Sequence, residues 1–484
     1  MKPFAYSSRS VLLASVFTGL FALNAVAQQP ASDTNTPAAT AATPAPAAPP
    51  AATPAPEVPP AAAPAPPPAP AAAAPAPAAP AVAAPAPAAA PPAPTTAQAP
   101  AAAPALPPGS PLIGRPDNPA AVKLAPIPAP PLPAAADKLP TAKLKLPPGF
   151  NIEVYASGIP TARTLREGDK GTIFVGSRFV DKVIAITNKD GKRTVKTLVS
   201  GLHRPNGLAV HNGALYIAEL SKVHRIDKVE DNLDNPKPTM IYDDLPKDEA
   251  HGWKFIGVGP DNKLYVPVGL PGNNVAASEK HAQIRRMDLD GKNAEVYVRG
   301  VRNTVGFDWH PATKQLYFTD NGRDWVSEDL PEDELNRVTK QGEHFGSPFC
   351  HQGNFPDPEF GWGRSCKEFV APVGLLGAHT AALGMRFYTG KMFPKEYQNV
   401  AFIARRGSWN KTVKLGGDVV MAKLNKDGTV KSIKPFLTGF LENNSYLGRP
   451  VDVLQLKDGS LLVSDDYNGA IYRITYGKQK VAGR

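Results

Sequence analysis

The stretch NGLAVHNGALYIAE (206–219) contains two short apolar strands joined by an Asn-Gly turn, and the same plan recurs along the chain. Alternating apolar residues on both sides of such a turn are the strongest short-range signal for a β-hairpin. Clear copies are FIGVGPDNKLYVPVG (255–269), VGFDWHPATKQLYFTD (305–320) and VDVLQLKDGSLLVSD (451–465), and looser copies are TLREGDKGTIFVGS (164–177) and LGMRFYTGKMFPKEYQNVAFIAR (383–405).

This repeat defines the expected fold class. Units of roughly 40–50 residues made of short strands and turns are typical of β-propeller blades and not of helical solenoids. Six copies therefore predict an all-β fold, a six-bladed β-propeller. An ordinary β-sandwich is the alternative interpretation.

The N-terminal residues predict export. Lys2 and Arg9 precede an apolar run at 11–23, and Ala-Val-Ala at 25–27 offers a cleavage site, so residues 1–27 are interpreted as a signal peptide. The protein is then periplasmic or secreted. A retained membrane anchor is the alternative, although the run is shorter than the roughly 20 apolar residues that a span requires.

An Ala/Pro-rich segment follows and predicts a disordered linker over 28–140. Its PAP and APAP runs favour extended polyproline geometry and cannot build a core. It serves either as a cell-envelope tether or as a solvated tail. Residues 141–484 remain for one propeller domain with a large interior.

Charge and cysteine content exclude several classes of partner. The net charge is +10, but no long Lys/Arg run with interleaved aromatic residues appears, which argues against nucleic-acid binding. Cys350 and Cys366 are the two cysteines, and in an exported protein they predict a disulfide, with free thiols as the alternative. There is no C-x-x-C-H motif for a c-type haem, so electrons released here would need a separate acceptor.

Aligning the six copies places two sets of residues around one axis. The first set, at the end of the second strand, is Ser177, Glu219, Val268, Asp320, Arg405 and Asp465. The second set, where the chain enters the first strand, is Arg163, Arg204, His251, Arg302, His379 and Arg449. A ring of guanidinium and imidazole groups predicts an anionic ligand. Alternatively, each arginine pairs with an acid of the first set and only joins blades.

A segment rich in carboxylates offers cation ligands. TDNGRDWVSEDLPEDELNRV (319–338) carries seven acidic side chains around a Gly-containing turn, and such oxygen ligands suit Ca²⁺. The segment lacks EF-hand spacing, and no His/Cys zinc cluster is visible.

Several separated motifs resemble one family. HGWKFIGVGPDNKLYVPVG, VRGVRNTVGFDWHP, ALGMRFYTGKMFPKEYQNVAFIARRGSWN and GRPVDVLQLKDGSLLVSDDYNGAIYRI, together with the acidic segment, make residues 142–477 similar to the soluble quinoprotein sugar dehydrogenases, especially the sorbosone dehydrogenase branch. The resemblance implies a six-bladed propeller that oxidises an aldose or related aldehyde by hydride transfer to pyrroloquinoline quinone (PQQ), with Ca²⁺ beside the cofactor.

The resemblance also implies roles for single residues. His251 matches the base that takes the substrate hydroxyl proton, and Arg302 matches an arginine near the quinone oxygen. The expected cofactor contacts are Asn303, His379, Arg405 or Arg406, and Arg449. The expected calcium contacts are the carbonyls of Gly322 and Arg323 at the catalytic ion and the side chain of Glu334 at a second ion.

Three residues depart from the family pattern. Leu270 stands where glucose-oxidising relatives place an Asp that orients the catalytic histidine, so another group must orient His251. Arg323 stands where relatives often have Pro, and Arg406 where branch members commonly have His. Two other functions therefore stay open: a non-catalytic propeller that binds an acidic glycan or cell-wall ligand, and a calcium-dependent lactonase.

Overall fold

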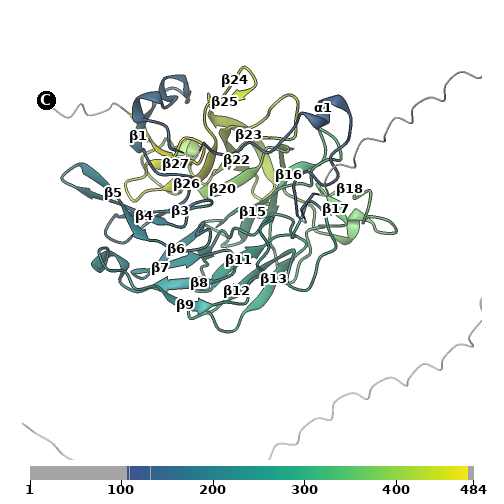
Figure 1. The fold of residues 1–484 in the computed structure, drawn as a ribbon, viewed down its shortest axis with the longest axis horizontal. Coiled ribbons are helices and arrows are strands. Elements are labelled where there is room, and N and C mark those ends of the chain that lie inside the picture. Colours follow the sequence, from purple (N-terminus) through teal and green to yellow (C-terminus); the bar gives the residue numbers. More distant parts are fainter. Residues whose placement is uncertain (1–105, 108, 131, 478–484) are drawn as a thin grey trace, which may run out of the picture. The chain divides into compact units, whose positions relative to one another are not determined.

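The computed structural model describes residues 106–477 except 108 and 131. These residues form six four-stranded antiparallel sheets that follow one another in chain order, which confirms the predicted six-bladed β-propeller (Figure 1). The predicted signal peptide and residues 28–105 of the predicted linker lie outside the described residues. Among the residues described, no helix has the length and apolar character needed to cross a membrane.

The blades have these bounds. Blade one comprises β2 (Ala162–Glu167), β3 (Ile173–Ser177), β4 (Val183–Lys189) and β5 (Lys192–Val199). Blade two comprises β6 (Gly207–His211), β7 (Ala214–Ala218), β8 (Val223–Ile226) and β9 (Thr239–Tyr242). Blade three comprises β10 (Gly257–Val258), β11 (Leu264–Val268), β12 (Gln283–Met287) and β13 (Glu295–Arg299).

The second half of the ring repeats the plan. Blade four comprises β14 (Gly306–Trp309), β15 (Leu316–Asp320), β16 (Glu332–Arg337) and β19 (Gly374–Ala378). Blade five comprises β20 (Ala382–Phe387), β21 (Ala401–Arg405), β22 (Asp418–Leu424) and β23 (Val430–Leu437). Blade six comprises β26 (Pro450–Gln455), β27 (Leu461–Asp465), β28 (Ala470–Tyr476) and β1 (Phe150–Ala156).

The ring is closed by a strand from the start of the domain. β1 pairs with β28 in antiparallel register, with Ile152 opposite Ile474, so the sixth blade is assembled from both ends of the propeller. Across the next junction the buried carboxylate of Asp452 on β26 accepts hydrogen bonds from Leu165 N (2.9 Å) and Arg166 Nη1 (3.2 Å) in blade one. Both contacts tie the first blade to the last.

The Asn-Gly turn behaves as its sequence predicts. Asn212 and Gly213 connect β6 to β7 with φ of 48° and 74°, the left-handed conformation at both positions that a type I′ hairpin turn requires. Apolar residues on both faces of the strands then pack between neighbouring blades. One such cluster joins Phe174 of blade one to Leu208 and Leu215 of blade two.

Shorter elements decorate this ring. Two small hairpins are β17 (Cys350–His351) with β18 (Phe355–Pro356), and β24 (Leu441–Glu442) with β25 (Ser445–Tyr446). Single 3₁₀ turns lie at Ala136–Lys138, Thr141–Lys143, Val229–Asp231, Cys366–Glu368 and Lys395–Tyr397. Cys350 and Cys366 form the predicted disulfide, which closes the excursion between β16 and β19.

The last part of the predicted linker makes defined contacts with the propeller. α1 (Pro119–Val122) begins after Asn118, whose side chain accepts a hydrogen bond from Ala121 N at 2.9 Å. Ala134 N donates to the Asn468 carbonyl at 2.9 Å, and Leu139 is buried in the core of the last two blades. The described residues of 106–140 therefore belong with the propeller in this structure.

Ring closure makes β1 a sensitive position. Ile152 packs against the core of blade six, so we expect Ile152→Asp to lower the free energy of unfolding by about 2 kcal/mol because it places a charge against that core. Val195→Asp, on the exposed outer strand β5, is the matched control and should change it by less than about 0.5 kcal/mol. Denaturant unfolding of the full chain measures both. Equal effects would contradict closure through β1.

Candidate functional site

One end of the propeller channel holds a cavity of about 420 Å³. Five of the six predicted strand-entry residues line it, namely Arg163, His251, Arg302, His379 and Arg449. The sixth, Arg204, instead pairs with Glu249, Nη2 to Oε2 at 2.5 Å. The blade repeat therefore gathers most of the predicted cationic set at one mouth.

Asp320 and Asp465, at the ends of the second strands, accept hydrogen bonds from backbone N–H groups and do not pair with guanidinium groups of the described residues. Asp320 accepts hydrogen bonds from the N–H groups of Arg302 and Asn303, both at 2.7 Å. Asp465 accepts one from Arg449 N at 2.8 Å. These carboxylates fix the loops that enter the same blades and leave the arginine side chains free to point elsewhere. The alternative in which Asp320 and Asp465 pair with the guanidinium groups is therefore wrong for Arg302 and Arg449.

Four arginines surround one carboxylate at the blade-six side of the cavity. Asp466 accepts from Arg163 Nη1 at 2.8 Å and from Arg406 Nε at 2.8 and 2.9 Å. Arg449 lies beside them and donates Nε to the Arg406 carbonyl at 3.1 Å. The fourth, Arg178, stacks on the ring of Trp253, with its Cζ 3.5 Å from the ring centre. We call Arg163, Arg178, Arg406, Arg449 and Asp466 the arginine cluster.

The arginine cluster carries unbalanced positive charge. Burial lowers the pKa of Arg163 to about 10, and burial together with the neighbouring Arg406 lowers that of Arg449 to about 9. Burial also lowers the pKa of Arg178 well below its ordinary value, with Arg163 and Arg406 adding to the effect. Burial would raise the pKa of Asp466, but Arg406 and Arg163 hold it below its usual range. One carboxylate is too little anionic charge for four guanidinium groups.

Three buried polar atoms of the cavity lining have no hydrogen-bond partner among the described residues. They are Arg178 Nε, Trp253 Nε1 and Asn410 Oδ1. Buried polar groups without partners are rare in native proteins and commonly mark a position that a ligand or water fills. Arg178 Nε and Trp253 Nε1 are donors, and together with the arginine cluster they indicate a ligand with several anionic oxygens; Asn410 Oδ1 is an acceptor and would take a donor group or a water.

His251 is oriented by the residue that departs from the family pattern. Its Nδ1 lies 2.9 Å from the Leu270 carbonyl oxygen. A carbonyl only accepts, so Nδ1 carries the proton and Nε2 of the neutral ring is left as a proton acceptor. Leu270 N in turn donates to the Arg302 carbonyl at 2.9 Å, which links the His251 and Arg302 loops. The backbone of Leu270 thus orients the ring, in place of the carboxylate expected from the family resemblance.

The electrostatics of His251 favour the neutral ring. Burial lowers the pKa of His251 well below 6.5, and the neighbouring Arg302 lowers it further. The neutral ring is therefore the favoured form at neutral pH, and it leaves Nε2 as a proton acceptor.

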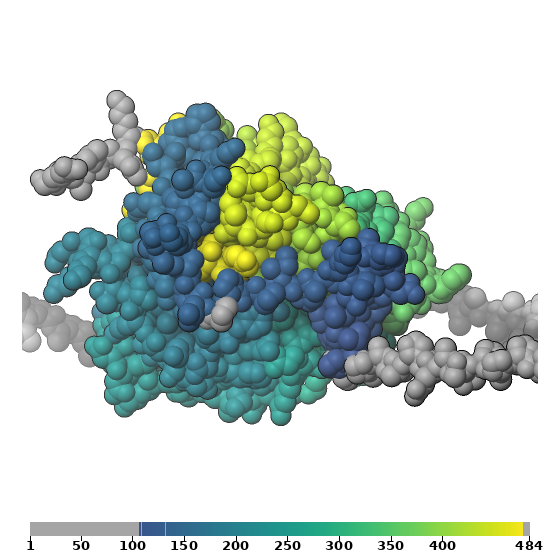
Figure 2. All heavy atoms as spheres, turned by 45° about the horizontal axis from the view of Figure 1, so that its top comes forward, coloured from purple at the N-terminus to yellow at the C-terminus, as the bar shows by residue number. Residues whose placement is uncertain are grey.

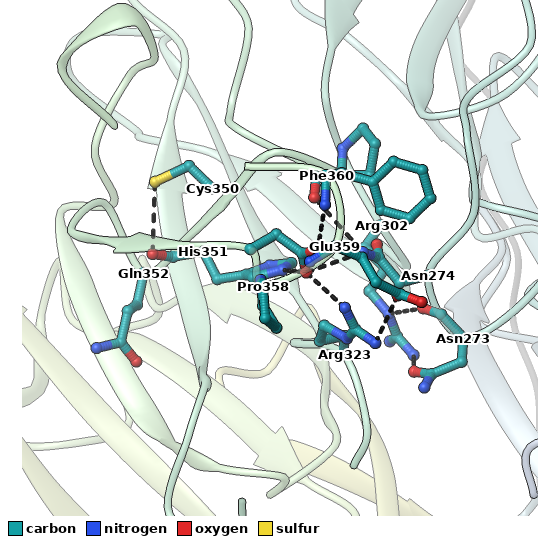
Figure 3. Close-up of polar contacts among 12 residues, drawn as sticks. Asn273, Asn274, Arg302, Arg323, Cys350, His351, Gln352, Pro358, Glu359 and Phe360 are labelled. Carbon is teal, nitrogen blue, oxygen red and sulfur yellow. Dashed lines mark hydrogen bonds and ion pairs between the residues drawn. The ribbon is translucent and has the colours of Figure 1, made fainter. Parts of the chain in front are cut away.

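Arg302 is held rigidly at the cavity wall. Its guanidinium donates to the Asn273 carbonyl (2.6 Å), the Asn273 side chain (2.9 Å) and the Asn321 carbonyl (3.1 Å), and it pairs with Asp324 at 3.2 Å. Figure 3 shows Arg302 lying against Asn273. Arg323 lies nearby and contacts the segment that contains Glu359. The fixed guanidinium presents positive charge beside His251.

Arg323 and Glu334 lie outside the main cavity lining. The Arg323 side chain pairs with Asp357 (2.7 Å) and Glu359 (3.1 Å) and is not part of the cavity lining. Glu334 lines a separate cavity of about 10 Å³ together with Asp320. Burial and the charge of Asp320 raise the pKa of Glu334 to about 8. The small cavity thus brings together two buried carboxylates, the type of oxygen ligand that Ca²⁺ prefers.

Most acids of the carboxylate-rich segment bind protein groups. Asp324 pairs with Arg302, Glu328 accepts from Thr412, Asp329 pairs with Lys411, Glu332 accepts from Gly377 N, and Asp333 accepts from Gly322 N. Within 106–477, apart from 108 and 131, no three His, Cys, Asp or Glu side chains converge on one point as metal ligands. In contrast, the carbonyls of Gly322 and Arg323 accept no hydrogen bond from a described residue. A cation here would be held by backbone oxygens.

The structure distinguishes Arg405 from Arg406, which the sequence left as alternative cofactor contacts. Arg406 lines the cavity, whereas Arg405 lies outside it and pairs with Asp418 on β22. The remaining predicted contacts that line the cavity are His251, Arg302, Asn303, Gly322, His379 and Arg449. Arg178, which directly follows Ser177 at the end of β3, was not among the predicted site residues. Side chains alternate along a strand, so the residue after the aligned position faces the channel, and this alternation was the available signal.

Comparison with known proteins agrees with this site. The family model described as "Glucose / Sorbosone dehydrogenase" matches residues 217–473. An uncharacterized protein of Borreliella burgdorferi is 35% identical over 360 residues, which cover 71% of this chain and 93% of that protein. The chain therefore belongs to the glucose/sorbosone dehydrogenase family, a family of oxidoreductases, and the resemblance seen in its sequence is confirmed.

Solved structures share the fold. The calcium structure of a Trichoderma reesei protein of Carbohydrate-Active Enzymes Family AA12 is 20% identical with a TM-score of 0.60, covering 69% of this chain and 97% of that chain. The holo form of the PQQ domain of pyranose dehydrogenase from Coprinopsis cinerea is 18% identical with a TM-score of 0.59 and the same coverages. At this identity the likeness establishes the propeller alone.

The state of His251 is measurable without any ligand. We expect the ¹⁵N spectrum of histidine-labelled protein to show a neutral, Nδ1-protonated ring at pH 7, because the Leu270 carbonyl fixes the tautomer and burial disfavours the charged form. His251→Gln assigns the signal by its loss. Since the pKa is lowered, protonation should begin only below 6.5. A ring that titrates above 6.5 would contradict this account.

Proposed function

We propose that this protein is an exported PQQ-dependent dehydrogenase that oxidises an aldose sugar or a related aldehyde. The observation that carries the proposal is the arginine cluster, in which four buried guanidinium groups lie around one carboxylate. PQQ bears three carboxylates and a planar quinone. Its charge and shape match an arginine-rich cavity that also contains the aromatic rings of Trp253 and Trp409.

Residues of the cavity divide into groups with distinct tasks. Arg449, Arg406 and Arg178 would bind the carboxylates, because guanidinium forks match such groups bidentately. The buried Nε of Arg178 has no partner among the described residues and is available to such a carboxylate. The carbonyls of Gly322 and Arg323 would hold Ca²⁺, a hard cation that prefers oxygen ligands. When bound, PQQ and its Ca²⁺ supply the electrophile that accepts two electrons from the substrate.

The chemistry assigned to the chain itself is proton transfer. Nε2 of His251 accepts the proton of the substrate hydroxyl, or of the hydrated aldehyde, while Nδ1–H donates to the Leu270 carbonyl. That carbonyl stabilises the imidazolium formed, as an orienting acceptor does beside other catalytic histidines. Arg302, fixed by Asn273, stabilises negative charge that develops on the oxygen nearest to it.

The proposed location and partners follow from other features. A disulfide at Cys350–Cys366 suits an oxidising compartment such as the periplasm or the exterior, in agreement with the predicted signal peptide. The reduced cofactor would pass its electrons to a separate acceptor, because the sequence has no haem attachment motif. The Ala/Pro-rich segment is proposed to act as a tether at the cell envelope.

Reconstitution tests the proposal. The purified protein, given PQQ and Ca²⁺, should show the spectrum of a bound quinone and reduce an artificial electron-acceptor dye when aldoses or aldehydes are added. Removal of Ca²⁺ with a chelator should abolish dye reduction. Quinone binding without turnover on a broad substrate panel would favour a binding protein, and no quinone binding at micromolar concentrations would refute the proposal.

Two substitutions separate the roles. His251→Ala should lower kcat by about 10²–10⁴-fold, the usual contribution of a general base, and leave the dissociation constant of PQQ nearly unchanged. Arg449→Ala should raise that dissociation constant by about 10–100-fold, because a charge-assisted hydrogen bond contributes about 1.5–3 kcal/mol. Kinetics and equilibrium binding measure both effects.

Arg204→Ala is the matched control, since Arg204 occupies the equivalent position in blade two but pairs with Glu249 outside the cavity lining. It should change neither quantity appreciably. If Arg204→Ala weakens cofactor binding as much as Arg449→Ala does, the effect is one of general charge and the assignment of Arg449 is wrong.

A further inference from the structure

Residues 109–130 cross the cavity mouth, and we call this segment the strap. It starts against blade three, where a Cβ on Gly109 would lie 3.2 Å from both Ala250 Cβ and the Pro271 carbonyl. Trp325 Nε1 then donates to the Pro111 carbonyl at 2.8 Å. At the far end, Arg449 Nη1 donates to the Ile127 carbonyl at 3.3 Å. Figure 2 shows this dark-blue segment lying across the surface between the teal and the yellow parts.

The strap forms part of the cavity wall. Pro111, Pro126, Ile127 and Pro128 line the cavity opposite the residues of the propeller channel. Proline and isoleucine side chains carry no hydrogen-bonding groups, so this wall limits size without offering polar contacts to an extended ligand. The chemistry of the site lies on the propeller side, and the strap sets how much space remains above it.

The strap has its own internal structure. Arg115 Nη1 donates to the carbonyls of Val122 (3.0 Å) and Leu124 (3.2 Å), and this folds the segment around α1. Leu124 and Ala121 are buried. Proline further restricts the backbone, because its ring fixes φ. The strap is thus a preformed cover and not a loose tail that happens to lie near the mouth.

The strap also binds a residue of the arginine cluster. The Ile127 carbonyl takes an N–H of Arg449, the residue that we assign to a cofactor carboxylate. The cavity of about 420 Å³ lies toward the lower end of the roughly 300–1,000 Å³ usual for ligand sites. A cofactor and one small substrate would fill it while the strap is in place.

We propose that the strap is a specificity element that limits the enzyme to substrates of monosaccharide size or smaller and excludes the chain ends of longer saccharides. This inference rests on the proposed dehydrogenase function for the identity of the substrate. According to this proposal, the strap as well as the propeller loops limits the size of the substrate that can enter the cavity. The proposal also requires that any ligand of the arginine cluster enter past the strap.

The test compares three full-length proteins. In the first variant, residues 109–130 are replaced by a Gly/Ser linker of equal length, which removes the wall and keeps β1 and the contacts that follow the strap. In the second, Arg115→Ala loosens the strap without altering the propeller, since Arg115 does not line the cavity. The unaltered chain is the reference. Unfolding temperatures establish that each variant is folded.

Two measurements apply to each protein. The first is the ratio of kcat/KM for a trisaccharide to that for its monosaccharide with PQQ and Ca²⁺ bound. The linker variant should raise this ratio about tenfold or more, and Arg115→Ala should raise it less. The second is the rate at which phenylglyoxal modifies Arg449 and Arg178 in the absence of cofactor, read by peptide mass spectrometry. This rate should rise about tenfold in the linker variant because the cover is gone.

The two measurements distinguish failure of the strap inference from failure of the proposed function. An unchanged saccharide ratio in variants that bind PQQ and turn over would overturn the inference and leave the dehydrogenase function standing. Equal modification rates in all three proteins would likewise overturn the strap as a barrier. If no protein binds PQQ, the proposed function fails and the assigned substrate limit fails with it, whatever the modification rates.

Discussion

The arginine cluster is the constraint on which the site depends. Burying four guanidinium groups around Asp466 is unfavourable in the ligand-free protein, since burial itself lowers the pKa of Arg163, Arg178 and Arg449. Asp466 offsets part of this cost by pairing with Arg163 and Arg406, while separate carboxylates, Asp320 and Asp465, satisfy the backbone of the entering loops. Backbone support is thus carried by acids, and the proposed ligand recognition by the arginines.

The proposed role of His251 as a base also requires an orienting group. The Leu270 carbonyl takes the place of the carboxylate expected from the family resemblance, and it fixes the tautomer without adding negative charge. The pKa of His251 consequently stays low, under the combined influence of burial and Arg302. In a cavity that must attract a polyanion, an orienting group without charge leaves the positive potential intact.

Much of the fold was predictable because it depends on local chemistry repeated six times. Short turns such as Asn212-Gly213 in blade two, flanked by apolar strands, define the repeated hairpins, and the propeller follows from their number. Closure through β1 was not predictable, because FNIEVYA (150–156) has no repeat partner in the sequence and is defined only by its pairing with β28. A strand pair formed by the two ends of the domain leaves no pattern in the sequence near either strand.

The site was predictable in outline for a similar reason. The alignment of the repeats predicted that His251, Arg302 and Arg449 lie at one end of the channel. It could not choose between Arg405 and Arg406, because adjacent residues at the end of a strand point to opposite sides. The same one-residue step concealed Arg178. The strap was hidden by composition, since its prolines resemble the preceding Ala/Pro-rich segment and only its contacts with Trp325 and Arg449 distinguish it.

The central claim is that buried guanidinium charge selects a polycarboxylate quinone. Isothermal titration calorimetry of the ligand-free protein with PQQ and with its trimethyl ester tests this most directly, because the two molecules share the ring system and differ in carboxylate charge. We expect one PQQ bound per chain with micromolar or tighter affinity, and ester binding weaker by about 100-fold or more. Equal affinities for the acid and the ester, or no binding of either, would contradict it.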